Sequence, residues 1–138
     1  MNPLSYTTLS HPEWDKKIAS GLYKECKVLT GITEDFKTHT IYVKSGETFA
    51  GGMSMEQYGE ILWINSFWIE PRFRKQGIGK GLLQNAILLA TQNKLKVIQL
   101  NTFFTETHAF FLTCGFENVA VIPNWKYGLE CYLMRKVL

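Results

Sequence analysis

The stretch that decides the fold reads Glu70-Pro71-Arg72-Phe73-Arg74-Lys75-Gln76-Gly77-Ile78-Gly79-Lys80-Gly81. It follows residues 61–69, an apolar and β-rich run that barely alternates, as expected of a strand covered on both faces inside a sheet. After it, apolar residues recur at Ile78, Leu82 and Ala86, which is the spacing of a buried helix face. The sequence therefore predicts a central strand, a basic glycine-rich turn and a helix, in that order.

This turn has the physical features of a phosphate-binding site. Free amides and the positive end of the dipole at a helix N-terminus attract an anion, and glycines let the backbone approach it closely. Arg74, Lys75 and Lys80 add positive charge at a helix start, where the dipole disfavours it. A bound diphosphate would relieve that conflict, so we interpret the turn as an anion site.

Spacing excludes two common phosphate loops. The nucleoside-triphosphate loop needs a glycine five residues before Gly79 and a Ser or Thr after Lys80, and this chain has neither. The dinucleotide fingerprint needs a third glycine where Leu82 stands, and an acidic residue at the end of the next strand, where Asn101 stands. The remaining pattern is Arg-x-x-Gly-x-Gly over residues 74–79.

Outside the turn, changes in apolar periodicity mark the other elements. Ser10, as N-cap before Pro12, predicts the start of a first helix, which Gly31 should end. We further expect a hairpin of strands 40–44 and 48–53, and a strand at 96–100 parallel to the central one. A short helix at 106–114 should follow, and then two strands, 116–122 and 129–137, split by residues 123–125. The predicted fold class is α/β (α+β), three-layered, with a mixed, mostly antiparallel sheet of about six strands and helices on both faces, in a single domain of residues 1–138.

Composition excludes several classes of protein. The 138 residues are 46% hydrophobic and 20% charged, so the chain can bury a core and is not of the disordered class. The 15 basic and 12 acidic residues give a net charge of +3, weaker than a nucleic-acid-binding domain normally carries. The longest apolar run, 86–90, is too short for a membrane span, and the cysteines and histidines lack metal-site spacing. We expect a cytoplasmic protein with no metal, nucleic acid or membrane partner.

The Arg-x-x-Gly-x-Gly turn resembles the acetyl-coenzyme A loop of the GCN5-related N-acetyltransferases, the GNAT family. Three more segments match that family in order and spacing: residues 50–53, residues 65–69, and Phe110-Phe111 followed by Gly115-Phe116. The resemblance extends from about Ile18 to Leu138. It implies the GNAT fold and an N-acetyltransferase that moves acetyl from acetyl-coenzyme A to an amine of a small molecule or peptide, as a monomer or homodimer.

The resemblance also implies where the co-substrate binds. The central strand and the next parallel strand should separate, and the pantetheine arm should follow the backbone of Phe67, Trp68 and Ile69. The diphosphate should bind at the turn, and the remaining expected contacts are Arg74, Lys75, Gln76, Gly77, Ile78, Gly79, Lys80 and Phe111. A neutral amine would attack the thioester directly in a ternary complex, with strand amides stabilising the oxyanion and coenzyme A leaving as a thiolate.

The chain departs from the family pattern at two positions that bear on proton transfer. Phe111 stands where relatives usually carry a tyrosine that protonates the departing thiolate, and Asn65 stands where close relatives carry an aspartate. Asn65 could orient a water, Glu60 could act as a base through water, and Tyr132 could replace the missing acid. The alternative is a non-catalytic sensor module that binds acyl-coenzyme A.

Overall fold

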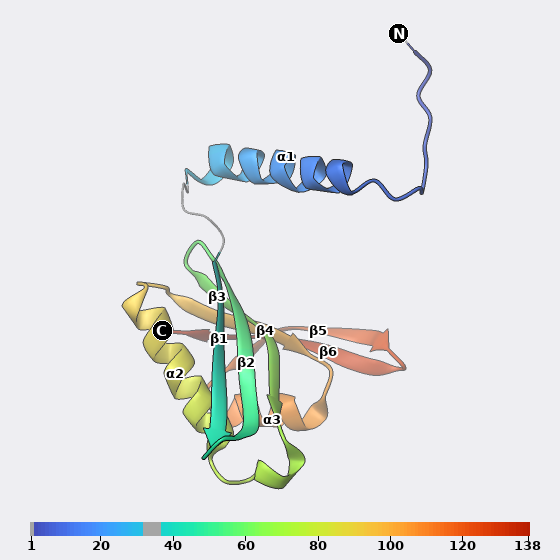
Figure 1. The fold of residues 1–138 in the computed structure, drawn as a ribbon. Coiled ribbons are helices and arrows are strands. Elements are labelled where there is room, and N and C mark those ends of the chain that lie inside the picture. Colours follow the sequence, from blue (N-terminus) through green and yellow to red (C-terminus); the bar gives the residue numbers. More distant parts are fainter. Residues whose placement is uncertain (1, 32–36) are drawn as a thin grey trace. The chain divides into compact units, whose positions relative to one another are not determined.

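The computed structural model describes residues 2–31 and 37–138, and the chain divides into two compact units at residues 1–35 and 36–138 (Figure 1). Each unit is described by itself. The single domain expected over residues 1–138 stays a prediction.

The first unit contains one helix, α1, over Pro12–Thr30. Its predicted end is confirmed, because Gly31 adopts a left-handed conformation with φ of 70° and donates its amide to the Lys27 carbonyl. The prediction that Ser10 is the N-cap is wrong: the N-cap is His11. Pro12 takes the first helical position and holds the residue before it in an extended conformation, so that residue flanks the helix.

The second unit is built on a six-stranded sheet with the order β1-β2-β3-β4-β6-β5. Only β3 and β4 pair in parallel among the described strands, and the other neighbours are antiparallel. The strands are β1 (Lys37–Ser45), β2 (Thr48–Tyr58), β3 (Ile61–Ile69), β4 (Val97–Thr102), β5 (Glu117–Lys126) and β6 (Leu129–Val137). The 3-10 turn Pro71–Phe73 and helix α2 (Ile78–Gln92) connect β3 to β4, and helix α3 (Thr105–Thr113) connects β4 to β5.

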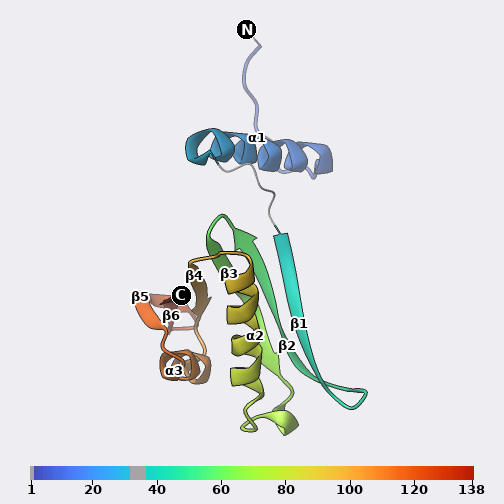
Figure 2. The ribbon, with the colours of Figure 1, turned by 90° about the vertical axis from the view of Figure 1, so that its left-hand side faces the viewer.

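Helices α2 and α3 pack on the same face of this sheet (Figure 2). Leu82 and Ala86 of α2 and Phe111 of α3 join one core with the sheet residues Met53 and Ile64, and all five are buried. The mixed, mostly antiparallel sheet of six strands is confirmed. Coverage of the second face would depend on α1 and stays a prediction. No helix in the described ranges is both long and apolar enough to span a membrane.

The last two strands differ from the prediction. Residues 123–125 do not split them, because β5 continues to Lys126 and the register with β6 shifts between Ile122 and Lys126. Pro123 is tolerated there since β5 is an edge strand, and Asn124 has a positive φ of 53°. The predicted break is therefore an irregularity within an edge strand.

Candidate active site

A bulge in β3 shapes the middle of the central strand. Ser66 pairs with Ser54 of β2, and Ile64 pairs with Met55, so the register passes over Asn65. The extra residue of a bulge is left out of the ladder and re-aims the strand that carries it. Asn65 is thus exposed at an irregular point of an otherwise regular strand.

Beyond its first residues, β3 separates from its parallel neighbour. The two strands pair from Ile61 with Val97 to Trp63 with Gln99, whereas β3 runs on to Ile69. This separation is the one predicted for the central strand. It leaves the second half of β3 with an open side toward β4.

The register shows which backbone groups of β3 face that open side. Gly51 of β2 lies opposite Ile69, and the Glu70 amide donates to the Ala50 carbonyl at 2.8 Å. In an antiparallel ladder this bond pattern makes Gly51 and Ile69 a non-hydrogen-bonded pair, so the amide and carbonyl of Ile69 point away from β2. Those of Phe67, two residues earlier, point the same way. Both residues therefore offer donors and acceptors to the open side.

Gly51 allows the close approach of β2 to this end of β3. A Cβ atom at Gly51 would lie 2.6 Å from the Trp68 carbonyl oxygen and 3.0 Å from the Ile69 Cα atom, both of them backbone atoms. We expect Gly51→Ala to lower the free energy of unfolding by about 1–3 kcal/mol, as other overpacking substitutions do. Denaturant unfolding measures this change.

Gly81→Ala is the matched control, since a Cβ atom at this α2 position meets nothing within 4 Å. It should raise the free energy of unfolding by up to about 1 kcal/mol through helix propensity. Equal destabilisation by the two substitutions would contradict the crowding at Gly51.

The glycine-rich turn brings several donors to the start of α2. Lys75 has a positive φ of 60°, and Gly77, the N-cap of α2, has a φ of 83°. The first turn of α2 contains Lys80 and no acidic residue, so its free amides are not offset by a carboxylate within that turn. The Arg74 Nε atom donates to the Ile69 carbonyl at 2.8 Å and ties the turn to the end of β3.

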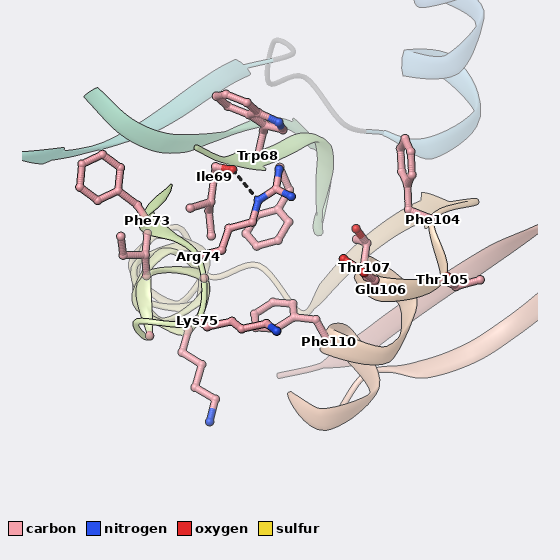
Figure 3. Close-up of a pocket in the computed structure, with 15 residues that line it drawn as sticks. Trp68, Ile69, Phe73, Arg74, Lys75, Phe104, Thr105, Glu106, Thr107 and Phe110 are labelled. Atoms are coloured by element: carbon pink, nitrogen blue, oxygen red, sulfur yellow. Dashed lines mark hydrogen bonds between the residues drawn. The ribbon is translucent and has the colours of Figure 1, made fainter. Parts of the chain in front are cut away.

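A pocket of about 790 Å³ lies between this turn and the start of α3 (Figure 3). Nine residues predicted for the co-substrate line it: Phe67, Trp68, Ile69, Arg74, Lys75, Gly77, Ile78, Gly79 and Lys80. Gln76 is not part of the lining; its side-chain amide donates to the Arg72 carbonyl at 3.3 Å. The structure therefore brings together most of the predicted binding set.

Gly79 is the point where α2, β3 and α3 meet. A Cβ atom there would lie 3.1 Å from the Phe110 ring and 3.2 Å from the Phe67 ring. These two rings stack with centroids 5.4 Å apart and an interplanar angle of 14°. A Cβ atom at these distances would force the two rings to move by a few tenths of an ångström, so a glycine fits this position best.

Sequence reasoning missed the opposite wall of the pocket. This wall is formed by residues at the start of α3: Phe104, Thr105, Glu106, Thr107 and Phe110. Phe73, in the turn before α2, also lines the pocket and was not predicted. The N-cap of α3 is Phe104, whose side chain cannot accept a hydrogen bond from the first amides of the helix. The N-termini of α2 and α3 therefore both border the pocket without a side-chain cap. The parallel pairing of β3 and β4 could have indicated this wall, because ligands bind outside the carboxyl ends of neighbouring parallel strands.

Phe111 lies in the core instead of the pocket lining. It is 0% exposed, and its ring makes edge contacts with Phe67, Phe110 and Phe116 at centroid distances of 5.0–5.3 Å. One step along a helix turns the side chain by about 100°, so Phe110 faces the pocket and Phe111 faces the sheet. Phe110 therefore lines the pocket in place of Phe111.

The three residues proposed for proton transfer are not gathered at the pocket. Glu60 precedes β3 at the end opposite Ile69, and its carboxylate lies 3.3 Å from the Lys96 Nζ atom. The Tyr132 ring stacks on His108 with centroids 3.6 Å apart. Glu60, Tyr132 and Asn65 are all absent from the pocket lining. Their catalytic roles stay predictions that these positions do not favour.

The pocket lining itself is poor in proton acceptors. Glu106 is the one carboxylate among the described lining residues, and the charged residues across the pocket are Arg74, Lys75 and Lys80. No group of three or more His, Cys, Asp or Glu side chains in the described part of the chain could hold a metal ion. The arrangement is suited to binding a phosphate-bearing ligand along a strand edge.

Comparison with known proteins gives a family match for most of the chain. The acetyltransferase (GNAT) family profile matches residues 6–116. No curated protein matches the chain.

Solved structures match the fold at low sequence identity. A protein from Agrobacterium tumefaciens assigned as an acetyltransferase has a TM-score of 0.85, 17% identity and 100% coverage of both chains. An acetyltransferase from Bacillus cereus has a TM-score of 0.87 and 18% identity, covering 97% of this chain and 98% of its own. A Bacillus anthracis protein assigned as a streptothricin acetyltransferase, in complex with acetyl-coenzyme A, has a TM-score of 0.68 and 16% identity, covering 78% of this chain and 65% of its own.

Proposed function

Because the chain belongs to the acetyltransferase (GNAT) family, we propose that it transfers acetyl from acetyl-coenzyme A to a primary amine of a small molecule or peptide. The observation that carries the proposal is the pocket that joins the basic turn to the open side of β3. An anion site and a free strand edge suit the two parts of the donor, its phosphates and its peptide-like arm.

The donor contacts follow from the pocket geometry. The amides at the start of α2, together with Lys75 and Lys80, would hold the diphosphate, and Arg74 would contribute its outer guanidinium nitrogens. The arm would pair with the backbone of Phe67 and Ile69. The volume of about 790 Å³ falls within the usual range for small-molecule sites. The cytoplasmic location and the monomeric or homodimeric state stay predictions.

The proposed reaction is a direct transfer. The amine nitrogen attacks the thioester carbonyl carbon, the carbon–sulfur bond breaks, and the sulfur leaves with the electron pair as a thiolate. The amine proton passes to a water or a side chain. Strand amides near the Asn65 bulge would donate to the oxyanion. A thiol with a pKa of about 8.5 leaves tolerably near neutral pH, so a missing general acid need not abolish transfer.

Two measurements test this function. Isothermal titration should detect binding of acetyl-coenzyme A, and absence of binding at about 1 mM donor would refute the proposal. Release of free thiol should then be followed across a panel of primary amines. Gly79→Trp places an indole against the Phe67 and Phe110 rings, so it should abolish donor binding and any thiol release together.

The sensor alternative is supported by the same pocket. The lining residues described offer Glu106 as their one carboxylate and no tyrosine or histidine, and Phe111 has no hydroxyl to donate. A sensor would bind acetyl-coenzyme A as tightly as an enzyme would, without turnover on any amine. Thiol release with any acceptor, lost in the Gly79→Trp variant, rejects the sensor.

The position of Tyr132 leads to a prediction about the acid. Because its ring stacks on His108 and is absent from the pocket lining, Tyr132→Phe should change kcat/KM little between about pH 6 and 9. Because Phe111 is buried and does not line the pocket, Phe111→Tyr should not raise turnover at any of these pH values. Initial rates of thiol release across this pH range measure both.

The same measurements can contradict this reading. A fall of about 100-fold or more in Tyr132→Phe would assign the acid to Tyr132. A rise in turnover for Phe111→Tyr, largest below the thiol pKa, would show that a hydroxyl at this position reaches the departing sulfur. Thermal unfolding of each variant separates an effect on chemistry from an effect on the core.

A further inference from the structure

The side chains of Arg74 and Lys75 leave the turn in different directions (Figure 3). Arg74 reaches back to the end of β3, where its Nε atom donates to the Ile69 carbonyl at 2.8 Å, and Lys75 points away from that strand. The basic residues of the turn are therefore not equivalent. One of them contacts the strand that the donor arm would follow.

The Ile69 carbonyl is one of the backbone groups that face the open side of β3. The bond from the Glu70 amide to the Ala50 carbonyl places the Ile69 amide and carbonyl on that side, with the corresponding groups of Phe67. Arg74 takes one of the two acceptor positions of the Ile69 carbonyl, so a ligand that pairs with this edge finds the Phe67 amide, the Phe67 carbonyl and the Ile69 amide open and shares the Ile69 carbonyl with Arg74. The bond thus limits where pairing can begin.

Arg74 can serve both parts of the pocket at once. Its Nε–H group is used by Ile69, and the two terminal nitrogens of the guanidinium keep further donors in a fixed fork. The Arg74 side chain also lines the pocket. A single planar group therefore links the strand edge to the anion site.

We propose that Arg74 is a positioning residue for the donor: it holds the Ile69 carbonyl, so that the thioester arm pairs at Phe67 while the diphosphate binds the outer face of the same guanidinium. This inference rests on the proposed function, because it concerns how acetyl-coenzyme A lies in the pocket. It goes further by assigning Arg74 a role toward the phosphate-free part of the donor. A residue that only supplied charge to the phosphates would have no such role.

Two substitutions separate the donor atom from the charge. The amide nitrogen of glutamine lies the same number of bonds from Cα as the Arg Nε atom, so Arg74→Gln keeps a donor for Ile69 and removes the charge. Lysine keeps the charge, has a methylene group at that position and carries its donors one bond further out, so Arg74→Lys moves the donor away from the place of the Nε atom. Lys80→Ala is the matched control, because it removes a charge from the same pocket.

The probes are acetyl-coenzyme A and S-acetylpantetheine, a thioester without phosphates, with dissociation constants measured by titration. Arg74→Lys should weaken S-acetylpantetheine binding by about 3- to 10-fold, the usual worth of one hydrogen bond. Arg74→Gln should bind this probe more tightly than Arg74→Lys does, and acetyl-coenzyme A less tightly. Lys80→Ala should lower affinity for acetyl-coenzyme A more than for S-acetylpantetheine. Equal S-acetylpantetheine affinities for Arg74→Lys and the wild type would overturn the proposal.

A measurement on the ligand-free protein keeps this inference distinct from the proposed function. The Arg74 Nε–H resonance should exchange with solvent more slowly than that of Arg72, which is also exposed, since Ile69 accepts it. Exchange at the rate of a solvated arginine overturns the contact itself. If the wild-type protein binds neither thioester while the Arg74 Nε–H stays protected, the proposed function and the role of Arg74 in positioning the donor are both overturned. The hydrogen bond between Arg74 and Ile69 is then still supported.

Discussion

Arg74→Glu is expected to lower the affinity for acetyl-coenzyme A by about 100-fold or more. The substitution removes the charge-assisted donors that would bind the diphosphate, and it breaks the bond to the Ile69 carbonyl. It also places a carboxylate at the pocket, beside the first turn of α2, which contains no acidic residue. Like charges at contact distance in a partly enclosed site are screened less than charges in bulk solvent. Isothermal titration with acetyl-coenzyme A gives the two dissociation constants.

Lys94→Glu is the control with the same change of charge. Lys94 is exposed and follows the C-terminal end of α2, so this 15-residue helix separates it from the anion site by about 22 Å. At ordinary salt a surface charge at that distance is screened, and the affinity should stay within a few-fold of the wild type. Equal losses in the two variants would refute the assignment of the turn as the phosphate site.

Phe111→Ala is expected to destabilise the protein by about 3–5 kcal/mol, the range for removing a large aromatic side chain from a core. Phe111 is 0% exposed, and three aromatic rings contact its ring, so little of the cavity can be filled by small movements. This loss is a large fraction of the stability of a typical domain. Denaturant unfolding at 25 °C measures it.

Phe104→Ala is the matched control, because Phe104 is 62% exposed at the start of the same helix. Its removal should change the free energy of unfolding by less than about 1 kcal/mol, as for most surface positions. If Phe111→Ala cost no more than Phe104→Ala, the central place of Phe111 in the core would be wrong. Donor titration of Phe104→Ala would also report whether its pocket position contributes to binding.

The glycine-rich turn was predictable because its information is local. A strand, two glycines and a helix start follow one another within residues 61–79, and the chemistry of a helix N-terminus does not depend on distant partners. Phe67, Trp68, Ile69 and most of residues 74–80, which the sequence predicts to bind the donor, line one pocket, and their binding role stays a prediction. The ends of the helices were also close, with Gly31 confirmed as the end of α1.

Residues whose role depends on orientation were predicted less well. Phe110 and Phe111 are identical in type and adjacent, so the sequence cannot say which ring faces the pocket. The phase of α3 against the sheet decides it, and that phase comes from packing around Phe67 and Phe116. Glu60 looked close to the site in sequence, but the length of β3 separates the two ends of the strand.

By itself, the sequence determined the order of elements, the mixed sheet, the glycine-rich turn between β3 and α2 and the family to which the chain belongs. Tertiary structure alone decided the point at which β3 and β4 separate, after Trp63 and Gln99, that the register passes over Asn65, and that Arg74 holds the Ile69 carbonyl. Local periodicity reflects which face of an element is apolar. Pairing between strands far apart in the chain depends instead on how side chains pack across the finished sheet, so the open edge and its pocket exist only once β2, β3, α2 and α3 have assembled.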